Sequence, residues 1–333
     1  MDAVIRTDMI KERPVSETRG RRNVADLLKC ALSRSHQDLL QTLSSAAESQ
    51  GSSLYLVGGF VRDLLLECES VDYDLVVEGN AIKLARELAK IHGGRVMEHR
   101  RFGTAKWHFP ATLATETGLL ALDLVSARTE YYPQPSALPE VESGSIRLDL
   151  HRRDFTVNTL AISLQSDQFG DLLDHWGGLK DLEDKRLRVL HSLSFVDDPT
   201  RMLRAVRLEQ RLGFQIERGS AELMELALPL LARVSGDRIR HEIEHIFAEA
   251  APEIMLARLD ELSVPGALHS AWNGHADTWL AERFVEARER ALWDELPAIY
   301  FGLWVYRLEW PDTEVICRLL KVTSVTMRVL KEN

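Results

Sequence analysis

Two aspartates at spacing i, i+2 are the first residues in the chain that could hold a metal ion. Asp72 and Asp74 flank Tyr73 and precede the apolar run 75–77. Because alternate side chains of a strand point to the same face, we expect both carboxylates to project together. Paired carboxylates suit a divalent cation that holds a nucleotide triphosphate. The same spacing is common on solvated strand edges, and on these residues alone that alternative stays open.

A glycine turn precedes the aspartates. The apolar run 54–57 leads into Gly58 and Gly59, and Arg62 and Asp63 follow at once. Glycine lets backbone amides approach a phosphate group closely, and an arginine adds a charge-assisted contact. The order strand, glycine turn, short helix and strand therefore predicts a phosphate-binding element beside the carboxylates.

A second candidate element, rich in arginine, lies in the other half of the chain. Arg201, Arg204, Arg207 and Arg211 are three, three and four residues apart, which places them along one helical face. Only Glu209 is nearby in sequence to compensate their charge. A solvated charged face is the usual interpretation of such a run, but the uncompensated charge favours an anionic partner.

Composition and charge bound the class of protein. The 333 residues are 45% hydrophobic and 28% charged, which indicates a soluble globular protein with enough chain for two to three domains. A net charge of -10 argues against a strongly basic coat for nucleic acid, although a local basic face would suffice. The three cysteines share no CxxC spacing, the N-terminus has no apolar core, and no run reaches membrane-spanning length. We expect a cytoplasmic protein with no membrane contact.

The elements that must position these residues follow from periodicity. Apolar positions recur at helical spacing over 23–50 and 80–92. Asp123 lies inside a predicted strand among apolar neighbours, where an acid is either unfavourable or useful. After residues 165–195 the pattern is helical. Further strands are predicted at 95–98, 105–109 and 119–126.

Four motifs occur in order: GGFVRD with DYD, RRDFTVN, DDPTRMLRAVR and DRIRHE. Over about residues 50–250 the chain resembles class II tRNA nucleotidyltransferases and bacterial poly(A) polymerases, of the DNA polymerase beta-like superfamily. The resemblance implies an α+β fold: a mixed β-sheet nucleotidyltransferase head with flanking helices, followed by all-α neck and body domains. We expect a flexible arm over 1–22, the head over 23–165, the neck over 166–250 and the body over 251–333.

The resemblance also implies an activity, the transfer of CMP or AMP from CTP or ATP to the 3′ end of tRNA with release of pyrophosphate. Asp72 and Asp74 would hold two Mg²⁺ ions about 3.5–4 Å apart, and Asp123 matches a third carboxylate. The remaining matches concern the nucleotide. Phosphate contacts would come from Gly58, Gly59, Arg62 and Arg152, and ribose contacts from Arg153, Asp154 and Asn158. Asp63 is a further expected nucleotide-binding residue.

Asp198 and Arg201 match the pair that reads the incoming base, supported by Arg204 and Arg207. Asp198 can accept from the exocyclic amine that adenine and cytosine carry and uracil and guanine lack on the matching edge, while Arg201 can donate to the adjoining ring acceptor. Asp198 is expected at the N-cap of a helix that starts at Pro199. In the last motif, Arg238 and Glu242 would brace this helix.

Several alternatives stay open. Addition of CCA, of CC, of the final A or of a poly(A) tail would all fit, although the near full-length segment 129–150 favours CCA or A addition. A non-catalytic RNA-binding relative is disfavoured because the motif residues all remain. The sequence leaves the oligomeric state and the RNA contacts of the short C-terminal region undetermined.

A pattern from another class of enzyme occurs in the last motif. His241, Glu242 and His245 satisfy the HExxH pattern of zinc metalloproteases, with Glu261 downstream as a third ligand. So short a pattern also arises by chance, and a neighbouring arginine such as Arg240 is unfavourable beside Zn²⁺. We therefore regard the zinc site as the remote alternative.

Overall fold

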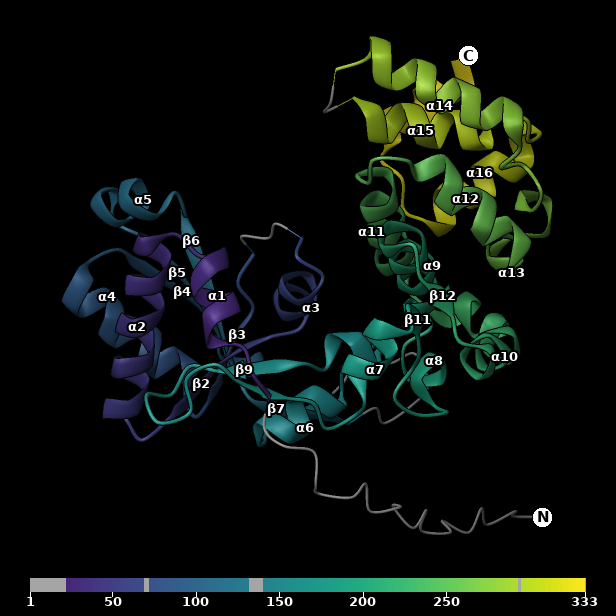
Figure 1. Ribbon diagram of the computed structural model, residues 1–333. Helices are drawn as coiled ribbons and strands as arrows, with labels where there is room; N and C mark the ends of the chain where they lie inside the picture. The colour runs from purple at the N-terminus through teal and green to yellow at the C-terminus, as the bar shows by residue number, and fades with distance from the viewer. Residues whose placement is uncertain (1–21, 69–71, 132–139, 293–294, 333) are drawn as a thin grey trace, which may run out of the picture.

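The computed structural model describes residues 22–68, 72–131, 140–292 and 295–332, so the arm expected over 1–22 lies outside it except for Arg22. One group of helices packs around a β-sheet, and a second, mainly helical group, which contains the short strands β11 (Arg186–Leu187) and β12 (Gln215–Ile216), stands beside it (Figure 1). Among the described residues, no helix is long and apolar enough to cross a membrane.

The head is built on an eight-stranded sheet in the order β1-β10-β9-β2-β3-β6-β5-β4. Neighbouring strands are antiparallel except β3 and β6, which run parallel. The sheet strands are β1 (Arg22–Asn23), β2 (Ser53–Val57), β3 (Leu75–Glu78), β4 (Arg95–His99), β5 (Thr104–His108), β6 (Ala121–Ser126), β9 (Ala161–Ser163) and β10 (Asp171–Leu173). β10 lies beyond the head boundary expected at residue 165, so the exact boundary stays a proposal.

Helices cover one face of this sheet, with α2 packed on β2 and α4 on β5 and β6. Leu43, Leu54 and Trp107 are fully buried between these layers. The head helices are α1 (Ala25–Ala31), α2 (Arg34–Ser49), α3 (Gly59–Leu65), α4 (Ala81–His92), α5 (Ala111–Thr117) and α6 (Ile146–His151). A separate hairpin, β7 (Arg128–Tyr131) with β8 (Glu140–Ser143), follows the sheet.

The helical stretch expected over 23–50 is divided into α1 and α2. Leu32 is extended between them, and Ser33 then caps α2 by accepting a hydrogen bond from the His36 amide at 3.3 Å. Asp72 and Asp74 precede β3 and do not lie within it, so the predicted strand begins later than expected. Their alternation nevertheless holds, because Tyr73 is buried while both aspartates are exposed.

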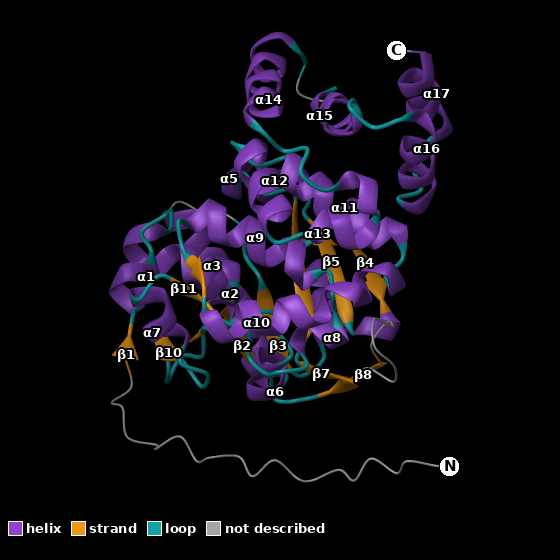
Figure 2. Cartoon of the chain, turned by 90° about the vertical axis from the view of Figure 1, so that its right-hand side faces the viewer, coloured by secondary structure: helices purple, strands orange, loops and turns teal. Residues whose placement is uncertain are grey.

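The neck and body are helical and share one continuous hydrophobic core that runs from Phe155 to Leu320. Helices α14–α17 form the end farthest from the sheet (Figure 2). The elements are α7 (Gly178–Glu183), β11 (Arg186–Leu187), α8 (Ser194–Asp197), α9 (Arg201–Leu212), β12 (Gln215–Ile216), α10 (Arg218–Ala227), α11 (Gly236–Phe247), α12 (Pro252–Glu261), α13 (Val264–Leu268), α14 (Thr278–Arg290), α15 (Leu296–Val305), α16 (Trp310–Leu319) and α17 (Ser324–Glu332).

Candidate active site

A cavity of about 620 Å³ lies between the head and helix α9 of the neck. It collects residues from motifs that are more than a hundred positions apart in the sequence. Of the predicted site residues, Gly58 is missing from the lining. The lining includes Gly59, Arg62, Asp63, Asp72, Asp74, Asp123, Arg152, Arg153, Asp154, Asn158, Asp198, Arg201, Arg204 and Arg207.

The three candidate metal ligands share one wall of this cavity. β3 and β6 pair in parallel with Leu75 opposite Leu124, so Asp74 and Asp123 each lie one residue before that pair. Desolvation raises the pKa of Asp74, and the charges of Asp72 and Asp123 add to the rise, while Arg153 opposes it. The three carboxylates are therefore close enough to repel one another.

The donor chemistry fits a divalent cation, but the side chains are not gathered as ligands. Within the parts of the chain that the structure describes, no three acidic, histidine or cysteine side chains converge on a metal position. Asp123 instead forms an ion pair of 3.0 Å with Lys106, its partner across β5 and β6. Asp123 sits on the exposed face of β6, between the buried Leu122 and Leu124, which explains an acid in an apolar run.

The glycine turn fits tightly around the acidic wall. Gly58 has φ +68°, and a Cβ there would overlap Arg153 Nη1 and lie 3.3 Å from Asp74 Oδ2. The Gly58 amide donates to the Leu160 carbonyl at 3.0 Å, so it is already engaged and does not offer the phosphate contact expected of it. Gly58 therefore allows Arg153 to lie against Asp74.

Arg62 is buried at the edge of the cavity, and the phosphate contact expected of it stays a prediction. Its Nε and Nη2 donate to the two oxygens of Asp63 at 2.8 and 2.9 Å, and Nη1 donates to Asn158 Oδ1 at 2.8 Å. The side chain of Arg62 therefore orients Asn158 at the edge of the cavity.

Asp154 connects the head to the neck. Its Oδ2 accepts from Arg204 Nε at 3.0 Å and Nη2 at 2.6 Å, and its Oδ1 accepts from Asn158 at 2.9 Å. Burial alone would raise the pKa of Asp154, but Arg204 and the bond from Asn158 outweigh it and hold the pKa well below its usual range. The pKa of Arg204 is raised in turn, chiefly by Asp154. Both groups are therefore charged.

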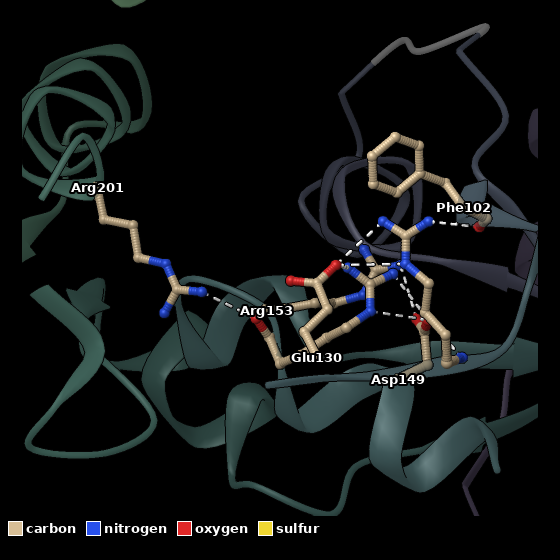
Figure 3. Close-up of polar contacts among 7 residues, drawn as sticks. Phe102, Glu130, Asp149, Arg153 and Arg201 are labelled. Atoms are coloured by element: carbon tan, nitrogen blue, oxygen red, sulfur yellow. Dashed lines mark hydrogen bonds and ion pairs between the residues drawn. The ribbon is translucent and has the colours of Figure 1, made fainter. Parts of the chain in front are cut away.

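Asp149 holds the two arginines of the RRD motif. It has no exposed surface, and its Oδ1 accepts from Arg152 Nε at 3.0 Å and Nη2 at 2.7 Å. Its Oδ2 accepts from Arg153 Nη2 at 3.3 Å. Figure 3 shows these side chains converging on one carboxylate.

The hairpin β7–β8 joins the same network through Glu130. Its Oε1 accepts from Arg128 Nη2 and from Arg152 Nη1, each at 3.0 Å (Figure 3). From the neck, Arg201 Nη2 donates to the Arg152 carbonyl at 2.9 Å, and Nη1 to Ser194 at 2.5 Å. One polar network thus extends from the hairpin to α9.

Sequence reasoning did not identify Arg128, Glu130 or Asp149. Asp149 precedes the two arginines by three and four residues, which is the spacing of helical ion pairs and was a usable signal. Arg128 and Glu130 form their pair within one strand and meet Arg152 only through the tertiary fold, so no local pattern indicated them.

The start of helix α9 differs slightly from the prediction. The helix begins at Arg201, but Asp198 still caps the preceding turn, because its Oδ1 accepts from the Thr200 amide at 3.0 Å and hydroxyl at 2.6 Å. Arg238 adds an ion pair to the same oxygen at 2.7 Å, and Glu242 pairs with Arg204 at 3.6 Å. The bracing role expected of Arg238 and Glu242 is confirmed.

The expectation that the arginines of α9 lack compensation is wrong. Asp154 and Glu242 compensate Arg204, while Glu249 lies 3.9 Å from Arg207. Arg211 lies 3.7 Å from Asp63 of the head. These acids come from other elements, so the local sequence could not show them. Glu209 is turned away and pairs with Arg258 at 2.8 Å.

The HExxH residues do not form a zinc-protease arrangement. His241 and His245 are exposed with their Nε2 atoms 3.0 Å apart, whereas Glu242 is buried and faces Arg204. Glu261 pairs with Arg258 at 2.7 Å. The pattern therefore contributes to the support of α9 and offers neither a base between the histidines nor a free third ligand.

Comparisons with known proteins agree with this geometry. Residues 54–188 match the family described as the Poly A polymerase head domain, and residues 213–265 match a probable RNA and SrmB-binding site of polymerase A. The chain is 43% identical over 251 residues to an A-adding tRNA nucleotidyltransferase of Geobacter sulfurreducens, covering 75% of this chain and 28% of that protein. It is 40% identical over 202 residues to a CC-adding tRNA nucleotidyltransferase of Deinococcus radiodurans, covering 60% of this chain and 51% of that protein.

The fold has a close counterpart among solved structures. A CCA-adding enzyme in an apo form superposes with a TM-score of 0.82 at 32% identity, covering 93% of this chain and 73% of the other. The chain spans only part of the length of the curated relatives that it matches. With the head profile, the RNA-binding profile and this structure in agreement, the chain belongs to the family of tRNA nucleotidyltransferases that share the poly A polymerase head domain.

Proposed function

We propose that this chain transfers a nucleotide from its triphosphate to the 3′ end of tRNA without a nucleic-acid template, with AMP as the first candidate. The observation that carries the proposal is that the carboxylates of the head and the Asp198–Arg201 region of the neck line one cavity. The A-adding relative supports AMP, and the CC-adding relative makes CMP the second candidate.

Asp72, Asp74 and Asp123 would hold two Mg²⁺ ions. When bound, such ions promote ionisation of the RNA 3′-hydroxyl and offset charge on the triphosphate as pyrophosphate leaves. Asp123 would exchange its ion pair with Lys106 for this role. Desolvation chiefly raises the pKa of Asp74, and a cation between the carboxylates would offset the further rise that comes from the charges of Asp72 and Asp123.

The arginines would bind the triphosphate. Arg153 lies against Asp74 and Gly58, and Arg152 lies behind it on the same carboxylate, so their charges face the place where the phosphates would meet the acidic wall. Asp149 holds both guanidiniums in place before a nucleotide arrives, which lowers the ordering cost of binding. Asn158 and Asp154, bonded to each other, would contact the ribose.

Base selection would rest on Asp198 and Arg201. The bonds from Thr200 and Arg238 end on Oδ1 of Asp198, which leaves Oδ2 to accept from an exocyclic amine. Arg201 carries five N–H donors. One from Nη1 is donated to Ser194 and one from Nη2 to the Arg152 carbonyl, so further donors remain for a ring acceptor of the base. A base with a keto oxygen at the amine position would face Asp198 with two acceptors opposed, a mismatch of about 1–3 kcal/mol.

An end-labelling assay tests the proposal directly. The purified chain receives tRNA that ends before CCA or after CC, with ATP, CTP, UTP or GTP and Mg²⁺. We expect AMP addition to the CC end and little use of UTP or GTP, with Asp72→Asn as the inactive control. Activity equal in wild type and Asp72→Asn would overturn the catalytic assignment, and equal use of all four nucleotides would overturn the base-reading assignment. The cytoplasmic location expected from the sequence stays a prediction.

A further inference from the structure

The residue between the two aspartates is anchored to the N-terminal helices. Tyr73 is 5% exposed, and its hydroxyl lies 2.8 Å from Nδ1 of His36 on α2. His36 is 9% exposed, and its Nε2 lies 2.7 Å from the carbonyl oxygen of Thr117, at the end of α5. Three segments far apart in the sequence thus meet directly behind the acidic wall.

The direction of these hydrogen bonds follows from the partners. A carbonyl oxygen only accepts, so Nε2 of His36 carries the hydrogen and donates to Thr117. Nδ1 is then the acceptor, and the Tyr73 hydroxyl donates to it. The chain of bonds is complete with a neutral histidine.

Packing fixes the ring as well as the hydroxyl. The ring of Tyr73 lies 5.0 Å from that of Phe60 in α3 and 5.4 Å from that of His36, the latter edge to face. Phe60 follows the glycine turn directly, so the anchor also touches the turn that lies against Asp74 and Arg153.

Successive side chains of an extended segment point to opposite sides, so fixing Tyr73 in the core turns Asp72 and Asp74 to the cavity. The hydrogen bonds between β2 and the segment leading into β3 extend only as far as Asp74, whose carbonyl accepts from the Val57 amide at 3.0 Å. β3 itself begins at Leu75. We propose that His36 and Tyr73 are positioning residues for catalysis, which hold the Asp72–Asp74 turn through the hydrogen bonds Thr117–His36–Tyr73. This inference rests on the catalytic role proposed for the two aspartates.

The test compares Tyr73→Phe with Ser44→Ala. Tyr73→Phe keeps the ring and removes only the hydroxyl. Ser44 is a matched control, because it is buried on the same helix and donates to the Leu164 carbonyl at 2.5 Å, away from the aspartates. We expect similar small losses of thermal stability in both variants. Only Tyr73→Phe should lower kcat, by about tenfold, with the KM for ATP changed less than twofold.

Amide hydrogen exchange gives a readout that does not depend on activity. In Tyr73→Phe we expect faster exchange in residues 72–76, and in Ser44→Ala no change there. A double-mutant cycle with His36→Phe completes the test: because both residues act through one bond, kcat of the double variant should equal that of either single variant within twofold.

Three results would overturn the proposal: equal kcat in Tyr73→Phe and Ser44→Ala, unchanged exchange at 72–76, or multiplicative losses in the double variant. The failure of the catalytic assignment itself has a different signature, since Asp72→Asn or Asp74→Asn would then remain active.

Discussion

The two walls of the cavity are built in opposite ways. On the head side, the carboxylates of Asp72 and Asp74 form no ion pair within the described residues, and the pKa of Asp74 is raised. On the neck side, Arg204 is bonded to Asp154, and Arg201 is bonded to Ser194 and to the Arg152 carbonyl. The carboxylates of the acidic wall therefore repel one another, whereas the arginines of the neck side have acidic partners from other elements. This difference fits the proposed roles of the two sides: nucleotide transfer at the carboxylates of the head, and recognition of the nucleotide by the neck.

The largest expected effect is on the acidic wall. Asp74→Asn should lower kcat about a thousandfold, the equivalent of about 4 kcal/mol in the barrier, because a proposed metal ligand is lost. Thermal stability should rise. A carboxyl whose folded pKa is raised binds its proton more tightly in the folded state, so at pH 7 its charge disfavours folding, and asparagine removes that charge. A single-turnover assay and a melting curve check both parts. A loss of both activity and stability would contradict the contrast between the walls.

The next effect is on the basic wall and concerns stability. Arg204→Met leaves the buried Asp154 carboxylate without its partner and should lower the free energy of unfolding by about 3–5 kcal/mol. The control is Arg211→Met, whose longer, more exposed contacts predict a change of about 0–1 kcal/mol. Urea unfolding measures both. Adding Asp154→Asn to Arg204→Met should restore part of the lost stability. Similar losses in Arg204→Met and Arg211→Met would contradict a larger stabilising role for the Arg204–Asp154 pair.

Asp198→Ala should change the choice of base more than the binding of triphosphate. We expect the preference for ATP over UTP to fall about 10- to 100-fold, while the KM for ATP changes less. Competition between the two nucleotides in one reaction gives the ratio. An unchanged ratio would remove Asp198 from base selection and leave it as a cap that is held by Arg238.

The smallest expected effect is on the pH dependence of stability, and it concerns His191, which lies near Arg201 and His151. Burial lowers the pKa of His191 to about 4, and Arg201 and His151 act in the same direction. Since the unfolded value is about 6.5, the unfolded chain takes up the proton first, and stability is lost as the pH falls from about 6.5 toward 4. His191→Gln should reduce this pH-dependent loss of stability by about 1–2 kcal/mol between pH 7 and 5. The exposed His99→Gln serves as the control for the replacement of a histidine by glutamine.

The local geometry of the candidate site residues was easier to predict from the sequence than their tertiary partners. The alternation that turns Asp72 and Asp74 to one side and the helical spacing of Arg201, Arg204 and Arg207 are local properties, and both appear in the structure. The ion pairs of α9 with Asp154, Glu242 and Glu249 are tertiary, so the local sequence suggested an uncompensated charge.

Burial was the property hardest to infer. Arg62 looks like a phosphate ligand beside a glycine turn, yet it is 4% exposed and bonded to Asp63 and Asn158. Tyr73 looks like a spacer between two acids, yet it is bonded to a helix 37 residues upstream. Such roles depend on which element covers the sheet, and no local pattern reports that.

The central claim is that the acidic wall carries the transfer reaction and the neck side selects the base. The most direct test measures nucleotide binding and transfer in one variant of each side. Asp74→Asn and Asp198→Ala receive the same tRNA ending in CC with ATP or UTP, and both nucleotide binding and single-turnover transfer are measured. We predict that Asp74→Asn binds ATP in preference to UTP but transfers neither, and that Asp198→Ala transfers AMP and, increasingly, UMP. Loss of base preference in Asp74→Asn, or loss of all transfer with intact preference in Asp198→Ala, would contradict the account.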